Sequence, residues 1–185
     1  MIDVNQLRRG RTFLHDGQIF KVTDYSHHKP GRGKATIRVN VRNVRTGTNR
    51  LLTFNSSERV EDIRVEKRTQ EYIYSDGEDL VFMDTETYEQ VSVPRTLFGD
   101  DALLIRENDS VELLSYELEV IDYKLPQTVE MEVIDAEAAI AGDRVSGATK
   151  EVTLETGYKV KTPLFVEVGD VIRVNTESGE YVTRV

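Results

Sequence analysis

Cysteine and tryptophan are absent from this sequence, and only four of its 185 residues are prolines. Without cysteine the chain cannot form disulfides or zinc–thiolate sites, which fits a reducing compartment. No apolar run is long enough to span a membrane, and the N-terminal MIDVNQLRRG lacks the apolar core of a secretory signal. We therefore expect a cytoplasmic protein that does not associate with membranes.

Patterns that carry catalysis or bind metals are also missing. There is no Gly-x-Ser-x-Gly elbow and no cysteine nucleophile. His27 and His28 are adjacent, so on a strand they point to opposite faces, and His15 lies in a turn of its own. The segment from His28 to Ala35 is not a Walker loop either. His28 stands where that motif has its first glycine, and Ala35 stands where it has serine or threonine after the lysine. We expect no catalytic residue, no cofactor and no metal.

Charge is distributed unevenly along the chain. Residues 1–68 contain 15 Lys and Arg against 7 Asp and Glu, whereas the remaining residues contain 9 against 26, for a net charge of -9. This asymmetry indicates a basic surface that attracts polyanions, attached to an acidic body. Because an acidic body repels nucleic acid, any RNA contact that it makes should be local.

Alternation of apolar and polar residues dominates the sequence and predicts strands. The segments 37–42 and 129–133 alternate strictly, while Ser75-Asp76-Gly77-Glu78 and Ser178-Gly179 are typical of hairpin turns. One short helix is expected over 99–108, capped by Asp100 or Asp101. Breaks in composition near 63–68 and at Pro126 divide the chain into three all-β modules of about sixty residues, each the size of a small barrel.

A cationic segment, Lys29-Pro30-Gly31-Arg32-Gly33-Lys34, joins two predicted strands. As a hairpin tip it would place Arg32 at the apex, where the flanking glycines allow close approach to a target. A guanidinium suits phosphate and stacks on bases, and Arg38, Arg42 and Arg45 would add charge along the arms. An ordinary exposed turn explains the same residues, and the residues alone do not decide between the two interpretations.

The sequence resembles the bacterial elongation factor P family over its whole length and in order. The resemblance is carried by KPGRGKA, VRNVRTG, TFNSSERVED, YIYSDGEDLVFMDTETYEQ, LPQTVEMEV, GDRVSG and TKEVTLETGYKVKTPLFVEVGDVIRVNTESGEYVTR. Val152 and Thr162 depart from the usual residues, alanine and valine. The resemblance implies an N-terminal SH3-like (KOW-type) domain over 1–64, a central OB domain over 65–127 and a C-terminal OB domain over 128–185. It also implies that these three small barrels form an elongated, L-shaped, tRNA-like arrangement.

The resemblance to this family also implies a monomeric factor that binds the 70S ribosome between the peptidyl and exit tRNA sites and stimulates peptide-bond formation at consecutive prolines. Its implied partners are rRNA, the peptidyl tRNA and the mRNA codon in the exit (E) site. The Arg32 tip would contact the peptidyl tRNA. The resemblance further implies two other RNA contacts, an exit-site codon loop (Gly142, Asp143, Arg144 and Gly147) and a C-terminal contact (Tyr181 and Arg184).

Arg32 itself departs from many family members, which carry a lysine there that an enzyme lengthens. A branch with arginine at this position is rhamnosylated, so the resemblance permits an arginine rhamnosyltransferase as a further partner and leaves open whether Arg32 is modified. Lys34 lies beyond the second glycine and does not match the modified position.

Three alternatives fit the sequence less well. The elongation-factor-P-like paralogue lacks an intact Lys-Pro-Gly-x-Gly tip, and the relative initiation factor five A is shorter, with one OB barrel. A general single-stranded RNA-binding OB protein needs basic tracks and stacking aromatics, which the acidic last two-thirds of the chain disfavour.

Overall fold

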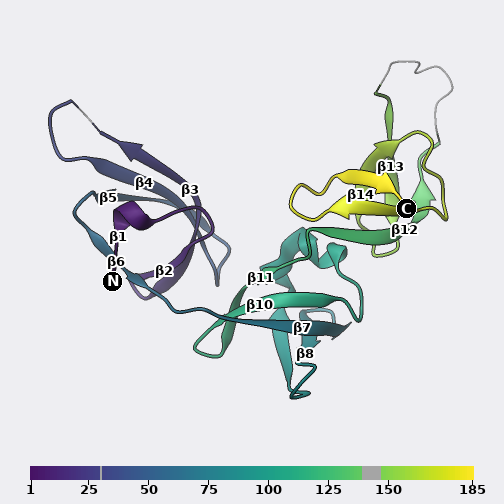
Figure 1. Cartoon of the computed structure of the whole chain (residues 1–185), viewed down its shortest axis with the longest axis horizontal. Coiled ribbons are helices and arrows are strands. Elements are labelled where there is room, and N and C mark those ends of the chain that lie inside the picture. Colours follow the sequence, from purple (N-terminus) through teal and green to yellow (C-terminus); the bar gives the residue numbers. More distant parts are fainter. Residues whose placement is uncertain (30, 139–146) are drawn as a thin grey trace. The chain divides into compact units, whose positions relative to one another are not determined.

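The computed structural model describes residues 1–29, 31–138 and 147–185, which form three sheets of short strands with little helix (Figure 1). This confirms the all-β prediction. In the described residues, no helix is long and apolar enough to cross a membrane.

The N-terminal sheet has six strands in the order β1-β6-β2-β3-β4-β5. Its elements are β1 (Ile2–Asp3), a 3₁₀ turn (Val4–Gln6), β2 (Thr12–His15), β3 (Gln18–His28), β4 (Thr36–Asn43), β5 (Asn49–Asn55) and β6 (Arg59–Asp62). Its inward side chains form one apolar cluster that includes Leu7, Phe13, Phe20 and Val39. Burial of these side chains fixes which face of each strand points outward.

The second sheet has five strands in the order β11-β10-β7-β8-β9. Its elements are β7 (Glu66–Ser75), β8 (Asp79–Met83), β9 (Gln90–Pro94), α1 (Arg95–Phe98), η2 (Gly99–Leu104), β10 (Ser110–Tyr116) and β11 (Glu119–Lys124). Phe98 stacks on Phe82 and Tyr123, with ring centroids 5.6 and 4.1 Å apart. The short helical segment is therefore held in place by aromatic packing.

The third sheet has five strands in the order β14-β13-β12-β15-β16. Its strands are β12 (Thr128–Ala136), β13 (Thr149–Leu154), β14 (Lys159–Pro163), β15 (Val171–Asn175) and β16 (Tyr181–Arg184). Val152 and Thr162 are both buried, and the Thr162 hydroxyl donates to the Pro163 carbonyl at 3.2 Å. Threonine is thus accommodated in an apolar site because its hydroxyl has a local acceptor.

Most local predictions are confirmed, with one correction. The turns at Gly77 and Gly179 join β7 to β8 and β15 to β16, and both glycines have positive φ (104° and 74°). The expected helix is instead split into α1, which begins at Arg95 after Pro94, and a 3₁₀ helix over Gly99–Leu104. Pro94 flanks α1 as its N-cap residue, with a non-helical ψ of 131°, and neither helical segment has a side-chain cap, so the expected Asp cap is wrong.

The chain forms two compact units, one comprising 1–67 with 114–122 and the other comprising 68–113 with 123–185. The first unit therefore includes a segment that lies far along the sequence. The domain limits at 64/65 and 127/128 stay a prediction, as does the L-shaped arrangement.

Candidate nucleic-acid interface

The cationic segment sits at the end of the long β3–β4 hairpin (Figure 1). The two strands pair from Phe20↔Asn43 to His28↔Thr36. On the other side of β4, β5 pairs as far as Thr36↔Asn55, and the Ser56 amide donates to the Ala35 carbonyl at 3.0 Å. The tip loop therefore follows directly from strands in which β4 is hydrogen-bonded to β3 on one side and to β5 on the other.

Strict alternation on β4 sorts its side chains between core and solvent. Ile37, Val39 and Val41 have 0% exposure, whereas Arg38 and Arg42, on the alternate positions of the strand, are exposed. Because three buried residues fix the register of the strand, neither arginine can turn inward without moving the core. The hairpin thus presents its cations on one outward face.

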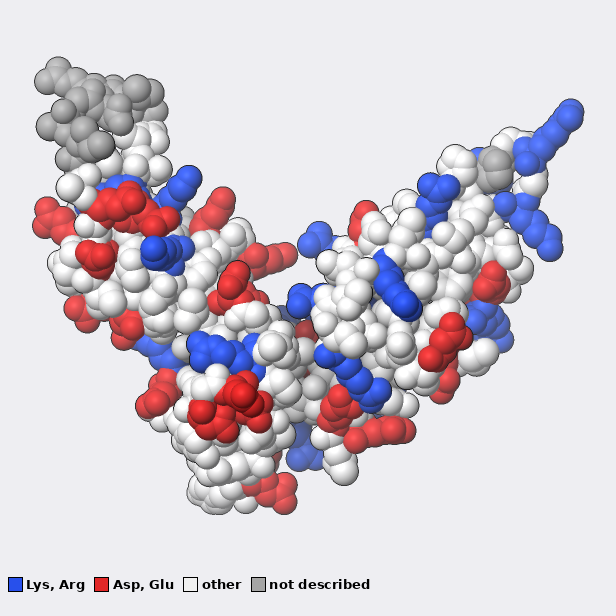
Figure 2. Space-filling view, turned by 180° about the vertical axis from the view of Figure 1, so that it is seen from behind, with Lys and Arg blue, Asp and Glu red and all other residues white. Residues whose placement is uncertain are grey.

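Residues of the tip are exposed wherever the structure describes them; Pro30 lies outside the described residues. Gly33 has φ of +126°, a conformation that side-chain-bearing residues rarely adopt. A Cβ at Gly31 would meet nothing within 4 Å, so the space beside Arg32 is open. Figure 2 shows Lys and Arg side chains at this end of the hairpin, with no acidic side chain among them in that view.

Cations near the base of the N-terminal sheet are neutralised, in contrast to those at the tip. Arg45 donates to Glu119 at 2.7 Å, and Lys21 pairs with Asp122 at 2.7 Å. The bond to Glu119 raises the pKa of Arg45, and the bond to Arg45 lowers the pKa of Glu119. Arg45 therefore adds no free charge to the arm, contrary to expectation, and it instead ties the β4–β5 turn to β11.

Within the part of the chain that the structure describes, the tip cations have no such partners. Among the described residues no ion pair involves Lys29, Arg32, Lys34, Arg38 or Arg42. Lys and Arg side chains of this kind release the condensed counterions of a nucleic acid when they neutralise its phosphates, with a gain in entropy. Guanidinium and ammonium groups in this arrangement have the chemistry that phosphate binding or base stacking requires.

No cluster of three or more metal-ligating side chains is present in the described part of the chain. His27 and His28 are exposed neighbours on β3. His15 instead packs edge-on against Phe54, with ring centroids 5.3 Å apart. The three histidines therefore do not converge.

The other two predicted RNA contacts lie in the second unit. Tyr181 is half-buried and packs against the core of the third sheet. The Arg184 guanidinium lies over the Phe165 ring, 5.2 Å from its centroid, and pairs with Asp170 at 3.5 Å. Sequence reasoning missed Phe165, which is 57% exposed; its position after Pro163 gave no sign that it faces solvent.

Gly142, Asp143 and Arg144 of the predicted exit-site loop lie outside the described residues. Gly147, at the end of that loop, is exposed with φ of +100°, and a Cβ there would meet nothing within 4 Å.

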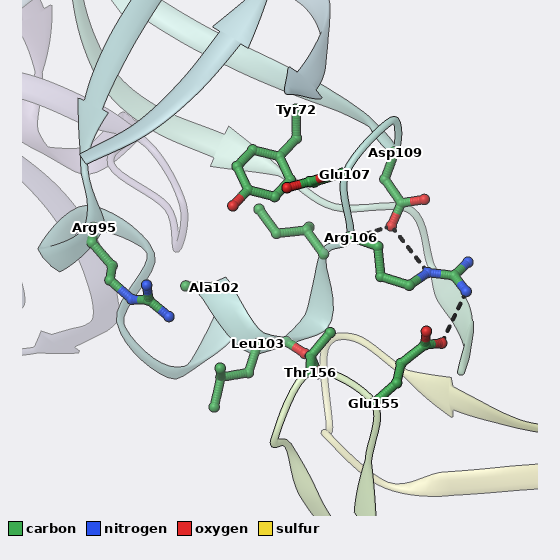
Figure 3. A pocket seen from close by; sticks show the side chains of 10 residues that line it. Tyr72, Arg95, Ala102, Leu103, Arg106, Glu107, Asp109, Glu155 and Thr156 are labelled. Atoms are coloured by element: carbon green, nitrogen blue, oxygen red, sulfur yellow. Dashed lines mark hydrogen bonds and ion pairs between the residues drawn. The ribbon is translucent and has the colours of Figure 1, made fainter. Parts of the chain in front are cut away.

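An open, polar pocket of about 540 Å³ in the second unit was not anticipated either (Figure 3). Arg106 bridges Asp109 (3.8 Å) and Glu155 (3.0 Å) along its rim. Burial, with a smaller contribution from Glu107, raises the pKa of the Tyr72 phenol that lines it. Because its cations are matched by carboxylates, the pocket does not resemble an anion site.

Comparisons with known proteins match all three parts of the chain to one protein family. Residues 3–60 match the family model "Elongation factor P (EF-P) KOW-like domain", residues 65–123 match "Elongation factor P (EF-P) OB domain", and residues 129–184 match "Elongation factor P, C-terminal". The chain is 42% identical over 185 residues, the full length of both proteins, to proteins named elongation factor P from Caldicellulosiruptor saccharolyticus and Pelotomaculum thermopropionicum.

Among solved structures, the chain resembles eukaryotic translation initiation factor 5A from Methanococcus jannaschii. The TM-score is 0.52 at 24% identity, covering 66% of this chain and 89% of that one. At this identity the likeness concerns the fold alone.

These matches define an all-β translation factor with a KOW-like domain followed by an OB domain. The chain belongs to the elongation factor P family, and the protein is a translation elongation factor.

Proposed function

We propose that this factor binds the 70S ribosome between the peptidyl and exit tRNA sites and accelerates peptide-bond formation at consecutive prolines. The observation that carries the proposal is Arg32, an exposed guanidinium between two glycines at the end of the β3–β4 hairpin, with no ion-pair partner among the described residues. In this proposal the factor acts in the cytoplasm as a monomer, and its partners are the peptidyl tRNA, rRNA and the codon in the E site.

Consecutive prolines create a positioning problem. The ring fixes φ and crowds the attacking nitrogen, and a run of prolines stiffens the nascent chain. Ribosomal peptide transfer depends on holding the two substrates in line, so a small displacement is costly. A factor that orders the acceptor end of the peptidyl tRNA would restore the geometry without taking part in proton transfer, and it would not itself be an enzyme.

The tip is suited to that task. Arg32 offers a planar fork of donors for a phosphate or for the face of a base. Lys29 and Lys34 supply additional charge beside it, and the open space at Gly31 admits the tRNA backbone. Pairing of β4 with both neighbours supports the loop from below, so less ordering entropy is lost on binding.

Rhamnosylation of Arg32 by an arginine rhamnosyltransferase would lengthen the tip and add hydroxyl groups that donate and accept hydrogen bonds. Intact-mass analysis of protein from its native host tests this directly. A mass increase of one deoxyhexose on a peptide that contains Arg32 would establish the modification, and an unshifted mass would refute it.

The second unit supplies two further proposed contacts. Gly142, Asp143, Arg144 and Gly147 would approach the E-site codon, and Arg144 would neutralise a phosphate. Tyr181 and Arg184 would form a separate RNA contact, distinct from the one at the E-site codon. Replacing residues 142–144 with alanine should weaken ribosome binding without changing thermal unfolding. Unaltered binding across a salt series would contradict this part of the proposal.

Reconstituted translation tests the function as a whole. Two messages that differ only in a Pro-Pro-Pro stretch are translated with and without the purified factor. We expect the factor to relieve the pause on the proline message and to leave the control message unchanged. Equal effects on both messages, or none on either, would refute the proposal.

A further inference from the structure

Arg8, at the end of the N-terminal 3₁₀ turn, is held in place by three neighbours. Its Nη1 atom donates to the Asn5 carbonyl at 2.8 Å and to the Leu7 carbonyl at 2.6 Å. Its guanidinium carbon lies over the Tyr25 ring, 5.1 Å from the ring centroid. Because a cation is attracted to the face of an aromatic ring, these contacts together fix the Arg8 side chain against β3.

Two nitrogens of this fixed side chain remain unused. No hydrogen bond or ion pair within the described residues involves Nε or Nη2 of Arg8, and the residue is exposed. Tying the 3₁₀ turn to β3 requires only Nη1, which bonds both carbonyls. Nε and Nη2 form a planar pair of donors, and such a pair can bind a phosphate through two parallel hydrogen bonds.

Hydrogen bonds connect Arg8 to the point where the tip loop enters β4. Arg8 bonds the Asn5 carbonyl, and the Asn5 side chain donates to the Ser56 carbonyl at 2.7 Å. The Ser56 amide in turn donates to the Ala35 carbonyl at 3.0 Å. Since Ala35 directly follows Lys34 of the tip, Arg8 lies at the tip end of the N-terminal sheet.

The Arg8 guanidinium adds a cation to the second face of the β3–β4 hairpin. Tyr25, on which it stacks, pairs with the buried Val39, whereas Ser26 pairs with the exposed Arg38. Paired residues of an antiparallel sheet share a face, and successive residues alternate between faces. Tyr25 and Arg8 therefore lie on the face opposite to Arg38.

Carboxylates that flank the 3₁₀ turn do not neutralise Arg8. Asp3 accepts from the Asn5 amide at 2.8 Å, which is the main cause of its lowered pKa. Glu58, whose carbonyl accepts from the Val4 amide, uses its carboxylate to accept from Asn55 at 2.8 Å. Arg8 thus has fixed geometry, free donors and no counter-charge from an ion pair among the described residues.

We propose that Arg8, positioned by Tyr25, binds a phosphate of the same RNA that the Arg32 tip contacts. A polyanion is favoured because the site adjoins the cationic tip, so one RNA backbone can meet both. The contact carries no sequence information, because a phosphate is the same at every nucleotide. The inference rests on the proposed function, which supplies the RNA at the tip.

Two adjacent arginines provide a matched test. Arg8→Gln and Arg9→Gln remove the same charge one residue apart, but Arg9 has no hydrogen bond, ring contact or ion pair among the described residues. We expect Arg8→Gln to bind 70S ribosomes roughly tenfold more weakly, because a charge-assisted hydrogen bond is lost, and to make the log–log salt dependence shallower by about one. Arg9→Gln should leave both quantities nearly unchanged, and equal effects of the two variants would overturn the inference.

Arg8→Lys covers the case in which Arg8→Gln fails to fold. Lysine keeps the charge and a donor for the two carbonyls, so this variant should unfold at nearly the same temperature as the unchanged protein. It lacks the second pair of donors and should still bind ribosomes more weakly. Undiminished binding by a folded Arg8→Lys variant would contradict the proposed phosphate contact.

Tyr25 variants test the positioning. Tyr25→Phe keeps the ring beneath the guanidinium and should bind like the unchanged protein. Tyr25→Leu removes the aromatic face and should weaken binding, yet it should cause no further loss when combined with Arg8→Gln. Thermal unfolding is measured for each variant, because a merely structural pair would lower the unfolding temperature without changing the salt dependence of binding. Additive losses in the double variant would show that Tyr25 does not act through Arg8.

Crosslinking identifies the class of partner. Because the chain has no cysteine, a single Arg9→Cys substitution carries a benzophenone probe beside Arg8. On 70S ribosomes with a peptidyl tRNA, the probe should crosslink to RNA, and crosslinks to protein alone would overturn the inference. Failure of the unchanged protein to bind ribosomes would instead refute the proposed function itself.

Discussion

Arg32 and Arg45 belong to the same basic region of the sequence, yet they have different environments. Arg45 is neutralised by Glu119, whereas Arg32 has no acidic partner among the described residues. Sequence reasoning placed Arg32 at the apex of the hairpin and Arg45 on an arm, and expected both to contribute charge. It could not foresee that Arg45 is neutralised, because Glu119 lies 74 residues away along the chain. Local spacing identified the tip glycines, but long-range charge pairing required the structure.

Gly33 and Gly31 flank Arg32 but should differ in their tolerance of a side chain. Alanine at Gly33 is strained at φ of +126°, at a cost on the order of 1–3 kcal/mol. Alanine at Gly31 meets open space. We expect Gly33→Ala to impair Pro-Pro-Pro rescue severalfold and Gly31→Ala to impair it less, as measured by pause release. Equal losses in the two variants would show that the tip conformation does not matter.

Glu119 should make stability depend on pH. Its pKa is lowered mainly by the hydrogen bond from Arg45, so the bond stabilises the folded state above the ordinary pKa of glutamate. That contribution disappears as the pH falls through the lowered pKa. Both side chains are about half exposed, so we expect it to be under about 1 kcal/mol. Denaturant unfolding from pH 3 to 7 should show a smaller loss in Glu119→Gln, and an identical loss would contradict the assignment.

Strands and turns were the most predictable elements of this protein. Alternation predicted β4 and β12, and glycine-containing turns predicted two hairpins, because each depends on neighbours in sequence. The helical region begins at Arg95, directly after Pro94 at the end of β9, and therefore earlier than the acidic pair suggested. Packing of Phe98 between Phe82 and Tyr123 involves residues from three separate segments, which periodicity alone does not reveal.

The β15–β16 turn should be less tolerant than the β7–β8 turn. Gly179 has φ of +74°, and a Cβ there would collide with the Tyr158 hydroxyl, whereas Gly77 has φ of +104° in open space. We expect Gly179→Ala to destabilise by roughly 2–4 kcal/mol, through strain and collision, and Gly77→Ala by roughly 1–2 kcal/mol. Urea unfolding compares them. Adding Tyr158→Phe should recover part of the Gly179→Ala loss, and no recovery would exclude the collision.

At the scale of the whole molecule, the chain is acidic, yet its β3–β4 hairpin carries several cations that have no ion pair among the described residues. Arg38→Gln combined with Arg42→Gln should weaken ribosome binding and make its salt dependence shallower by about two in log–log slope, because two phosphate contacts are lost. Lys161→Gln, an exposed change on β14, provides a charge-loss control and should alter neither quantity. If Lys161→Gln weakened binding and flattened the salt dependence as much per lost charge as the double arginine variant does, only net charge would matter.

The central claim is that Arg32 positions the peptidyl tRNA. The most direct test measures the rate of peptide-bond formation on a Pro-Pro-Pro message in reconstituted translation, comparing Arg32→Ala with the unchanged factor and with Lys34→Ala. We predict that Arg32→Ala loses roughly tenfold or more of the acceleration while ribosome affinity and thermal unfolding change little, and that Lys34→Ala keeps most of it. Full acceleration by Arg32→Ala would contradict the account.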